Sequence, residues 1–181
     1  MAAGDERTRR ITLISGSART DGHTGALVAY LSGKLGARAQ HVDLSTLTVA
    51  PFDYARHDDR DDFRSVVTMM LESQDIVFAT PVYWYAMSAP LKAFFDRLTD
   101  LLLDPVDRTS GRALAGRSVW LLATGADRSM PPGFEVPFKR TARYFRMVWR
   151  QSFYVEWING APLPPAGRAE MDKLANLIIA Q

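Results

Sequence analysis

The sequence predicts a doubly wound α/β fold built on one parallel sheet of five strands. Short apolar runs alternate with longer amphipathic helical patterns along the chain, which is typical of parallel strands covered by helices on both faces. The length of 181 residues fits one domain, and a chain of this size can bury a full core without disulfides. Strands are expected near residues 10–15, 38–44, 75–80, 117–123 and 151–157.

The apolar patterns of these runs also predict the order of the strands. Residues 75–79 and 119–123 are almost continuously apolar, as central strands covered on both faces should be, and residues 11–14 come close to that. Residues 40–44 and 152–157 alternate between apolar and polar side chains, which favours the two edges of the sheet. The predicted order is therefore 2-1-3-4-5, the flavodoxin-like arrangement.

Five helices are expected between and after these strands, each with an apolar stripe at helical spacing. In the third, Ser88 is a plausible N-cap with a proline in the first turn. In the second, the acidic start Asp58-Asp59-Arg60-Asp61-Asp62 is interpreted as compensation of the helix dipole rather than a metal site, because no histidine or second carboxylate cluster has ligand spacing. The helical patterns cover residues 23–36, 59–74, 88–103, 134–149 and 167–180.

Composition excludes several classes of protein. The chain has no cysteine, which removes disulfides, thiolate zinc sites and cysteine-held iron–sulfur clusters. Its formal net charge of +2 is too small to indicate a nucleic-acid partner. The start MAAGDERTRR lacks the apolar core of a secretory signal, and no apolar run reaches the ~20 residues of a membrane span. We expect a cytoplasmic protein with a polar tail over 1–9 and a single domain over 10–181.

The loop after the first strand reads SGSARTDGHT over residues 15–24 and leads into a helix. In a doubly wound sheet ligands bind beyond the carboxyl ends of the strands, so this loop lies where a ligand is expected. Its hydroxyls, its glycines and Arg19 meet the free N–H groups of a helix start, a combination that favours a phosphate. A capped turn with a solvated Arg19 explains the same residues. The loop matches neither the dinucleotide-binding fingerprint nor a P-loop.

The loop after the third strand carries three consecutive aromatic residues, Tyr83, Trp84 and Tyr85. They follow neither the period of a strand nor that of a helix, so packing into a core explains them poorly. A planar heterocyclic ligand explains them better, because rings and backbone edges can line its plane.

Together the two loops resemble a known family. G-S-x-R-x-x-G-x-T over residues 16–24 and T-P-x-Y-W-x-x-M-S-x-x-L-K-x-F-x-D-R over 80–97 look like the flavodoxin-like NAD(P)H-dependent FMN reductases. The resemblance covers roughly residues 10–158. It implies that the FMN phosphate is held by Ser17, Arg19, His23 and Thr24. It implies that the isoalloxazine edge is lined by Pro81, Val82, Tyr83, Trp84 and Tyr85, with a third flavin loop at Thr124, Gly125 and Ala126. His23 departs from the asparagine or serine common in relatives.

The resemblance also implies a function. An FMN enzyme of this family takes a hydride from NADPH or NADH and passes it to a small acceptor by ping-pong kinetics, the acceptor being a quinone, an azo or nitro compound, a metal ion or free flavin. The resemblance further implies a homodimer. No side chain is assigned as catalytic, no metal is expected, and the sequence does not choose between the two nucleotides or among the acceptors. The alternatives are a flavodoxin-like electron carrier without a substrate of its own, which is disfavoured by the slightly basic charge, and a flavin-free binding module.

Two further segments carry open interpretations. The fourth helix is expected to present a basic face, which is either solvated or a site for nucleotide phosphates; its residues are Lys139, Arg140, Arg143, Arg146 and Arg150. The proline-rich segment 127–133 either edges the substrate pocket or simply connects a strand to a helix. His41 is expected to be structural or exposed, and His57 to be solvated beside the acidic cluster.

Overall fold

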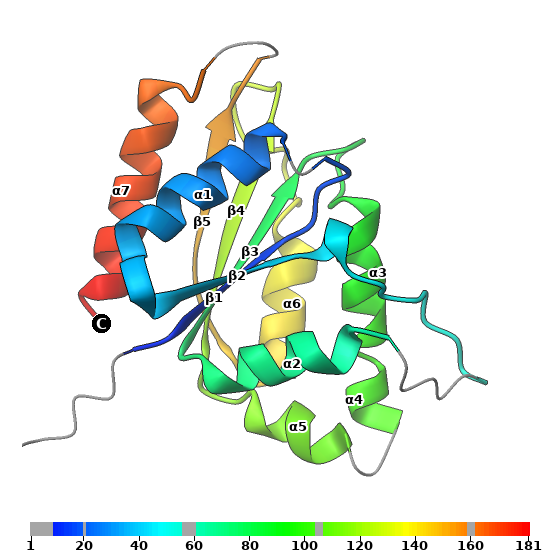
Figure 1. The fold of residues 1–181 in the computed structure, drawn as a ribbon. Coiled ribbons are helices and arrows are strands. Elements are labelled where there is room, and N and C mark those ends of the chain that lie inside the picture. The colour runs from blue at the N-terminus through cyan, green and yellow to red at the C-terminus, as the bar shows by residue number, and fades with distance from the viewer. Residues whose placement is uncertain (1–8, 20, 56–60, 104–106, 159–161) are drawn as a thin grey trace, which may run out of the picture.

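The computed structural model describes residues 9–19, 21–55, 61–103, 107–158 and 162–181. Five strands form one sheet in the order β2-β1-β3-β4-β5, and every neighbouring pair is parallel. The predicted fold class and strand order are confirmed (Figure 1). The strands are β1 (Ile11–Ser15), β2 (Ala39–Asp43), β3 (Asp75–Pro81), β4 (Ser118–Gly125) and β5 (Val148–Glu156).

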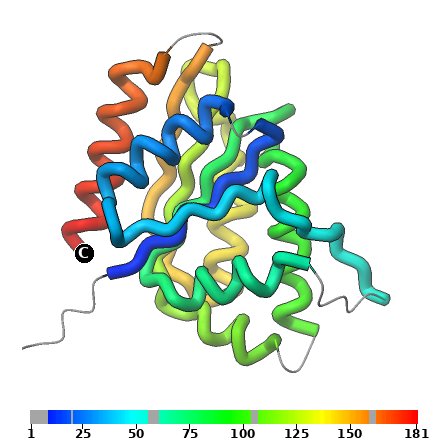
Figure 2. Tube along the Cα trace, viewed as in Figure 1, coloured from blue at the N-terminus to red at the C-terminus, as the bar shows by residue number. Residues whose placement is uncertain are grey.

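Helices cover both faces of the sheet and divide the apolar core in two. One face carries α1 (His23–Leu35) and α7 (Pro165–Ile179), and the other carries α2 (Phe63–Glu72), α3 (Ala89–Arg97) and α6 (Val136–Tyr144) (Figures 1 and 2). Side chains of β3 alternate between the two cores: Val77 packs with α1 and α7, while Ile76 and Phe78 pack with α2, α3 and α6. The remaining short elements are α4 (Asp100–Leu103), α5 (Asp107–Ala113) and the 3₁₀ turns Gly36–Arg38 and Leu44–Thr46.

Burial follows the predicted division into central and edge strands. Every residue of β1 and β3 is buried, and all of β4 is buried except Gly125. In β2 only Val42 is buried, and β5 alternates over its second half. None of the helices in the described ranges has the length and apolar character needed to cross a bilayer.

The predicted third helix is interrupted where the sequence shows no break. Over the expected range 88–103 the chain forms α3, a tight turn and then α4, and α5 follows as an additional helix. The apolar period continues through the turn because Leu98 and Leu101 are both buried, so periodicity could not reveal it. The predicted N-cap is confirmed, since Ser88 Oγ accepts a hydrogen bond from the Leu91 amide at 3.4 Å.

The predicted fourth helix ends earlier than expected, and the prediction that it reaches residue 149 is wrong. Helix α6 stops at Tyr144, and Arg146 then adopts a left-handed conformation with φ 56°. The Arg146 amide donates to Arg143 O at 3.1 Å and the Met147 amide to Ala142 O at 2.8 Å, the two bonds of a Schellman cap. Glycine is the usual residue at this position, so the arginine hid the helix end.

The early end of α6 also breaks up the predicted basic face. Only Lys139, Arg140 and Arg143 belong to α6, whereas Arg146 lies in the cap. Arg150 lies in β5, where its guanidinium donates to Ser118 Oγ at 3.0 Å. A continuous stripe of five cations along one helix is therefore absent.

The acidic segment before α2 ties a neighbouring loop instead of acting through the helix dipole alone. Asp61 accepts from the Ala50 amide at 3.0 Å and pairs with Arg97, and Asp62 accepts from the Thr48 amide at 2.7 Å. Asp58, Asp59 and His57 lie outside the described residues. Among the described residues no group of three or more His, Cys, Asp or Glu side chains could hold a metal. His41 has a structural contact, a 2.8 Å hydrogen bond to Ser15 Oγ.

Candidate functional site

The loop after β1 passes very close to the start of α3. The Gly16 amide donates to Ala79 O at 2.9 Å, and Ser88 Oγ donates to Gly16 O at 2.7 Å. A Cβ atom on Gly16 would lie 2.5 Å from Leu91 Cβ, closer than two carbon atoms can approach. Only glycine therefore lets this loop turn toward α1 while α3 keeps its place.

The start of α1 offers backbone donors to an anion. Gly22 is its N-cap residue and makes no side-chain capping bond, so the first amides of the helix keep the free donor character of a helix start. Ser17 lies just before this helix, and its buried hydroxyl accepts from the Arg19 amide at 3.2 Å. Thr24 is buried in the first turn and pairs its hydroxyl with Thr124 at 3.0 Å. The segment has the donor chemistry that a phosphate needs.

Arg19 is exposed beside this helix start and pairs with Asp21 at 3.1 Å. The hydrogen bond with Asp21 raises the pKa of the Arg19 guanidinium, and the negative charge of Asp21 acts in the same direction. The same hydrogen bond holds the pKa of Asp21 below its usual value. The guanidinium is thus charged and solvent-accessible.

His23 has a contact that the sequence did not predict. Its imidazole stacks on the indole of Trp157 with the ring centroids 4.2 Å apart and an angle of 2° between the planes. The Trp157 amide donates to Gly125 O at 2.9 Å, which fixes the chain just after β5. The first residue of α1 is therefore braced by the end of β5, a contact between residues 134 positions apart that no local pattern shows.

The aromatic run after β3 forms a tight, strained turn. Tyr83 and Ala86 pair through two backbone hydrogen bonds of 3.0 Å, and the two residues between them have positive φ angles, 48° for Trp84 and 64° for Tyr85. Such a turn normally contains Asn and Gly, and each bulky residue in it costs roughly 1–2 kcal/mol. Trp84 is 92% exposed and Tyr85 71% exposed. Backbone strain of this kind gathers at functional sites.

The third predicted flavin segment begins inside β4, since Thr124 and Gly125 are the last two residues of that strand and only Ala126 follows it, and it contacts both other loops. Thr124 is buried, and its carbonyl accepts from the Val82 amide at 2.7 Å. Gly125 lies against Tyr154, since a Cβ atom there would be 2.6 Å from the phenolic oxygen. The Tyr154 hydroxyl donates to Asp127 O at 2.8 Å, and burial raises its pKa. Tyr154 therefore holds the start of segment 127–133 next to Gly125.

The three loops lie at the same, carboxyl end of the sheet (Figure 1), where hydrogen bonds join them in pairs. Ser88 to Gly16 links the first and second loops, Thr24 to Thr124 the first and third, and Val82 to Thr124 the second and third. We call this edge the loop rim, defined by residues 15–19, 21–24, 80–88 and 124–127. The structure brings all twelve predicted site residues to it: Ser17, Arg19, His23, Thr24, Pro81, Val82, Tyr83, Trp84, Tyr85, Thr124, Gly125 and Ala126.

The rim offers two chemistries side by side. The start of α1 supplies amides, hydroxyls and one guanidinium for a phosphate. The other two loops supply exposed rings and backbone edges for a planar ring system. The sequence did not predict the contacts of Tyr154 and Trp157 or the hydrogen bond from Ser88 to Gly16, because each joins residues that are distant in the sequence.

Comparisons with known structures agree with this fold. The Trp repressor binding protein from Bacillus subtilis superimposes with a TM-score of 0.71 at 22% identity, over 95% of this chain and 98% of that one. An NADPH-quinone reductase from P. pentosaceus gives a TM-score of 0.65 at 14% identity, over 94% of this chain and 97% of that one. At such identities the likeness shows the fold alone.

Comparisons of sequence identify the family. The Bacillus subtilis (strain 168) protein YwqN, named as an NAD(P)H-dependent FMN-containing oxidoreductase, is 30% identical over 124 residues, which are 65% of this chain and 67% of that protein. The model of the NADPH-dependent FMN reductase family matches residues 9–148. The family expected from the two loop motifs is thereby confirmed. The chain belongs to the NADPH-dependent FMN reductase family, enzymes that use FMN with a nicotinamide nucleotide as electron donor.

Proposed function

We propose that this enzyme oxidises NADPH or NADH and reduces a small acceptor at the loop rim by ping-pong kinetics. The observation that carries the proposal is the joining of all three loops by hydrogen bonds at one edge of the sheet. The acceptors that suit such chemistry are quinones, azo and nitro compounds, metal ions and free flavin. FMN, when bound, supplies the hydride chemistry, and the protein supplies binding, orientation and electrostatics.

The phosphate end of the cofactor is assigned to the β1–α1 loop. Ser17, Arg19, His23 and Thr24 stand around the start of α1, whose amides favour an anion. Ser17 and Thr24 are buried and already hydrogen-bonded, so they shape the loop, whereas Arg19 is exposed and can exchange Asp21 for phosphate oxygens. The stack of His23 on Trp157 holds the imidazole at the mouth of this loop.

The ring end of the cofactor is assigned to the other two loops. The segments Pro81–Tyr85 and Thr124–Ala126 run side by side, joined by the Val82 to Thr124 hydrogen bond. The strained turn fixes the direction of Trp84 and Tyr85, whose exposed rings can cover a planar substrate and exclude water from it. When FMN is bound, the nucleotide and the acceptor would use the same exposed face of its ring system in turn. This shared face is the reason to expect ping-pong kinetics.

A variant of Arg19 tests the assignment of the phosphate end. Arg19→Ala should weaken FMN binding by about 10- to 100-fold, the range for hydrogen bonds to a charged group. Flavin retention is measured by equilibrium dialysis of the purified protein, with Arg38→Ala as the matched control, since Arg38 is exposed in the turn after α1. Equal flavin affinity in the two variants would contradict the role given to Arg19.

Initial rates test the kinetic part of the proposal. With NADPH varied at several fixed quinone concentrations, double-reciprocal plots should give parallel lines. Intersecting lines would contradict one shared face. The same assay with NADH identifies the preferred nucleotide, and a panel of acceptors identifies the preferred class.

Assembly and location are proposed from the family resemblance. A homodimer would cover part of the apolar surface that Trp84 and Tyr85 expose, and a dimeric mass in sedimentation equilibrium is the expected result. A monomeric mass would contradict it. The single domain over 10–181 predicts one cooperative unfolding transition. The cytoplasmic location stays a prediction, which fractionation of the source cells tests.

A further inference from the structure

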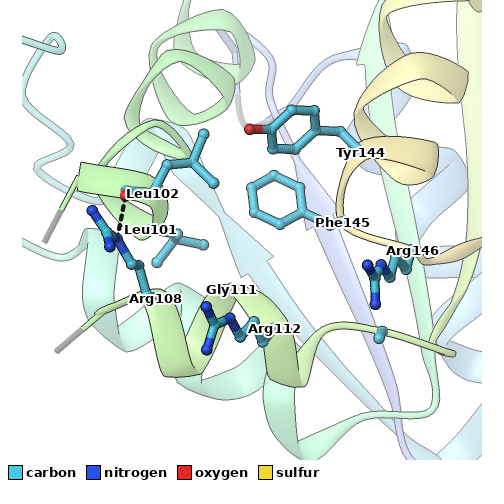
Figure 3. A pocket seen from close by; sticks show the side chains of 9 residues that line it. Leu101, Leu102, Arg108, Gly111, Arg112, Tyr144, Phe145 and Arg146 are labelled. Atoms are coloured by element: carbon cyan, nitrogen blue, oxygen red, sulfur yellow. Dashed lines mark hydrogen bonds between the residues drawn. The ribbon is translucent and has the colours of Figure 1, made fainter. Parts of the chain in front are cut away.

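A cavity of about 530 Å³ lies at the end of the sheet opposite to the loop rim. Its walls come from α4, α5 and the cap that ends α6 (Figure 3). The Gly116 amide donates to Arg146 O at 2.9 Å, which places this cap beside the amino end of β4. Because β4 has eight residues, roughly 23 Å of strand separates its amino end from the rim. The cavity is therefore no part of the flavin or nicotinamide site.

Three arginines line this cavity, and no acidic side chain is among its described lining residues. Arg108 is oriented by one hydrogen bond from Nε to Leu102 O at 2.8 Å, which leaves its terminal nitrogens available. For Arg112 and Arg146 the described residues provide no side-chain hydrogen bond or ion pair. By contrast, Arg97 uses its guanidinium on Asp61, Asp100 and Ala50 O. The cavity arginines are thus exposed, and their terminal nitrogens are not engaged by other described side chains.

The cavity also has apolar lining, which is partly aromatic and partly aliphatic. Phe145 is buried and Tyr144 is 67% exposed, with their rings 5.5 Å apart at 72°. Leu101 and Leu102 of α4 add apolar lining on the side of Arg108 (Figure 3). Figure 3 shows the two rings on one side of the cavity and Arg108 and Arg112 on the other. A ligand that fills the space meets apolar surface and cations at once.

Two backbone features shape the cavity at some expense of stability. Gly111 in the middle of α5 lets that helix pack on α4, because a Cβ atom there would lie 2.9 Å from Leu101 O. Arg146 keeps a left-handed conformation that glycine would adopt without strain. Glycine would end α6 without this strain, so the choice of arginine at this position is not explained by the cap itself.

We propose that this cavity binds a planar aromatic anion, with its ring on Phe145 and Tyr144 and its carboxylate or phosphate held by Arg112, Arg146 and Arg108. The volume lies within the range of small-molecule sites, roughly 300–1,000 Å³. Guanidinium groups bind both kinds of anion through paired hydrogen bonds. An aromatic wall beside them selects an anion that carries a ring over a small inorganic one.

The test is calorimetric titration of the FMN-loaded enzyme with three probes. Adenosine monophosphate joins a ring to a phosphate, salicylate joins a ring to a carboxylate, and ribose 5-phosphate has the phosphate without the ring. Saturable binding of either aromatic probe, with weaker binding of ribose 5-phosphate, is expected, and the stronger aromatic probe identifies the anion. Absence of saturable binding at millimolar concentration, or equal binding of ribose 5-phosphate, would overturn the proposal.

Variants locate the binding and separate it from the rim. The double variant Arg112→Gln with Arg146→Asn keeps a good helix former in α5 and a residue tolerant of positive φ in the cap. The double variant should bind the aromatic probe about 10-fold more weakly or worse, while turnover with NADPH and a quinone stays normal. Arg38→Gln is the control and should bind the probe as the parent does. Unchanged probe affinity in the double variant would overturn the proposal and leave the flavin assignment standing.

Discussion

The two ends of the sheet differ in whether their polar groups are already paired within the protein. At the rim, hydroxyls and backbone groups are used on one another: Ser88 holds Gly16, and Thr24 holds Thr124. At the opposite cavity, Arg112 and Arg146 have no polar side-chain partner among the described residues. The loops of the rim are therefore tied to one another by their own hydrogen bonds, while the cavity offers long cationic side chains that are not tied to other described side chains. The first arrangement suits a resident cofactor and the second a ligand that comes and goes.

The two ends share one property, which is strain in the backbone. Trp84 and Tyr85 have positive φ angles at the rim, and Arg146 has one at the cavity. Apart from glycines, these are the residues with positive φ among those the structure describes. All of them border a proposed binding site. The comparison indicates that side chains, and not backbone preference, decided the residue type at these three positions.

The largest expected change in stability concerns Arg97, whose guanidinium is fully engaged in contacts within the fold. Asp61→Asn removes the carboxylate that pairs with the buried Arg97 and should lower the free energy of unfolding by about 3 kcal/mol at pH 7. Urea denaturation measures it. The control is Asp96→Asn on the same helix as Arg97, where an exposed pair with Lys92 is lost and a change within about 0.5 kcal/mol is expected. Equal effects would show that the Asp61 pair is no more important than a surface pair.

The same carboxylate predicts a dependence on pH. Burial raises the pKa of Asp61, but hydrogen bonds from Arg97, Ala50 and Phe63 outweigh it, so the pKa in the folded protein lies below the usual value. A depressed pKa contributes stability that is present above about pH 3.9 and is lost as the pH falls through the folded value. The gap between parent and Asp61→Asn should therefore narrow below about pH 3.9. A gap that stays constant into that range would contradict the assigned pairing.

The next effect breaks the rim itself. Gly16→Ala puts a methyl group against Leu91 and should cost about 2 kcal/mol of stability together with much of the flavin affinity. Gly22→Ala is the control, because its nearest heavy atom would be 3.5 Å away and only the N-cap preference of glycine is lost, about 0.5 kcal/mol. Denaturation and flavin titration of both variants measure the difference. Loss of flavin from the Gly22 variant alone would contradict the role of the close approach.

The rim was largely predictable from the sequence because its residues are contiguous in three short loops. The parallel order 2-1-3-4-5 brings those loops to one edge, and the apolar runs predicted that order. What could not be predicted is how the loops are joined. The Thr24 to Thr124 bond spans 100 residues, and no local pattern announces it.

The opposite end was not predictable for a related reason. Its cavity depends on where α6 stops, and the usual glycine signal is replaced by Arg146. The apolar and basic period ran on through the cap, so Trp149 and Arg150 were assigned to a helix although they lie in β5. The break between α3 and α4 was hidden in the same way, because Leu98 and Leu101 both face the core. The apolar periodicity of a sequence indicates which side chains are buried. Where a helix ends inside a packed layer, the following side chains are buried too, so the periodicity does not show the end of the helix.

A smaller effect tests the strain at the rim. Replacing Trp84-Tyr85 by Asn-Gly supplies the residues that this turn prefers and should raise the free energy of unfolding by about 1 kcal/mol. Turnover with NADPH and a quinone should fall, because the two rings proposed to cover the substrate are lost. The control Tyr54→Asn removes another exposed aromatic ring away from the strained turn and should leave turnover unchanged. A stabilised variant with full activity would show that the rings serve another purpose.

The smallest effect tests the strain at the cavity. Arg146→Gly relieves a left-handed conformation costing about 1–2 kcal/mol but adds the chain entropy of glycine, about 0.5–1 kcal/mol, so a gain of about 0.5 kcal/mol is expected. Arg143→Gly, three residues earlier inside α6, should instead lose about 1 kcal/mol. Thermal unfolding of the two variants measures the change in stability, which should be positive for Arg146→Gly and negative for Arg143→Gly. A loss in both would mean that the Arg146 side chain stabilises the fold, and the argument that it is kept for a ligand would then lose its basis.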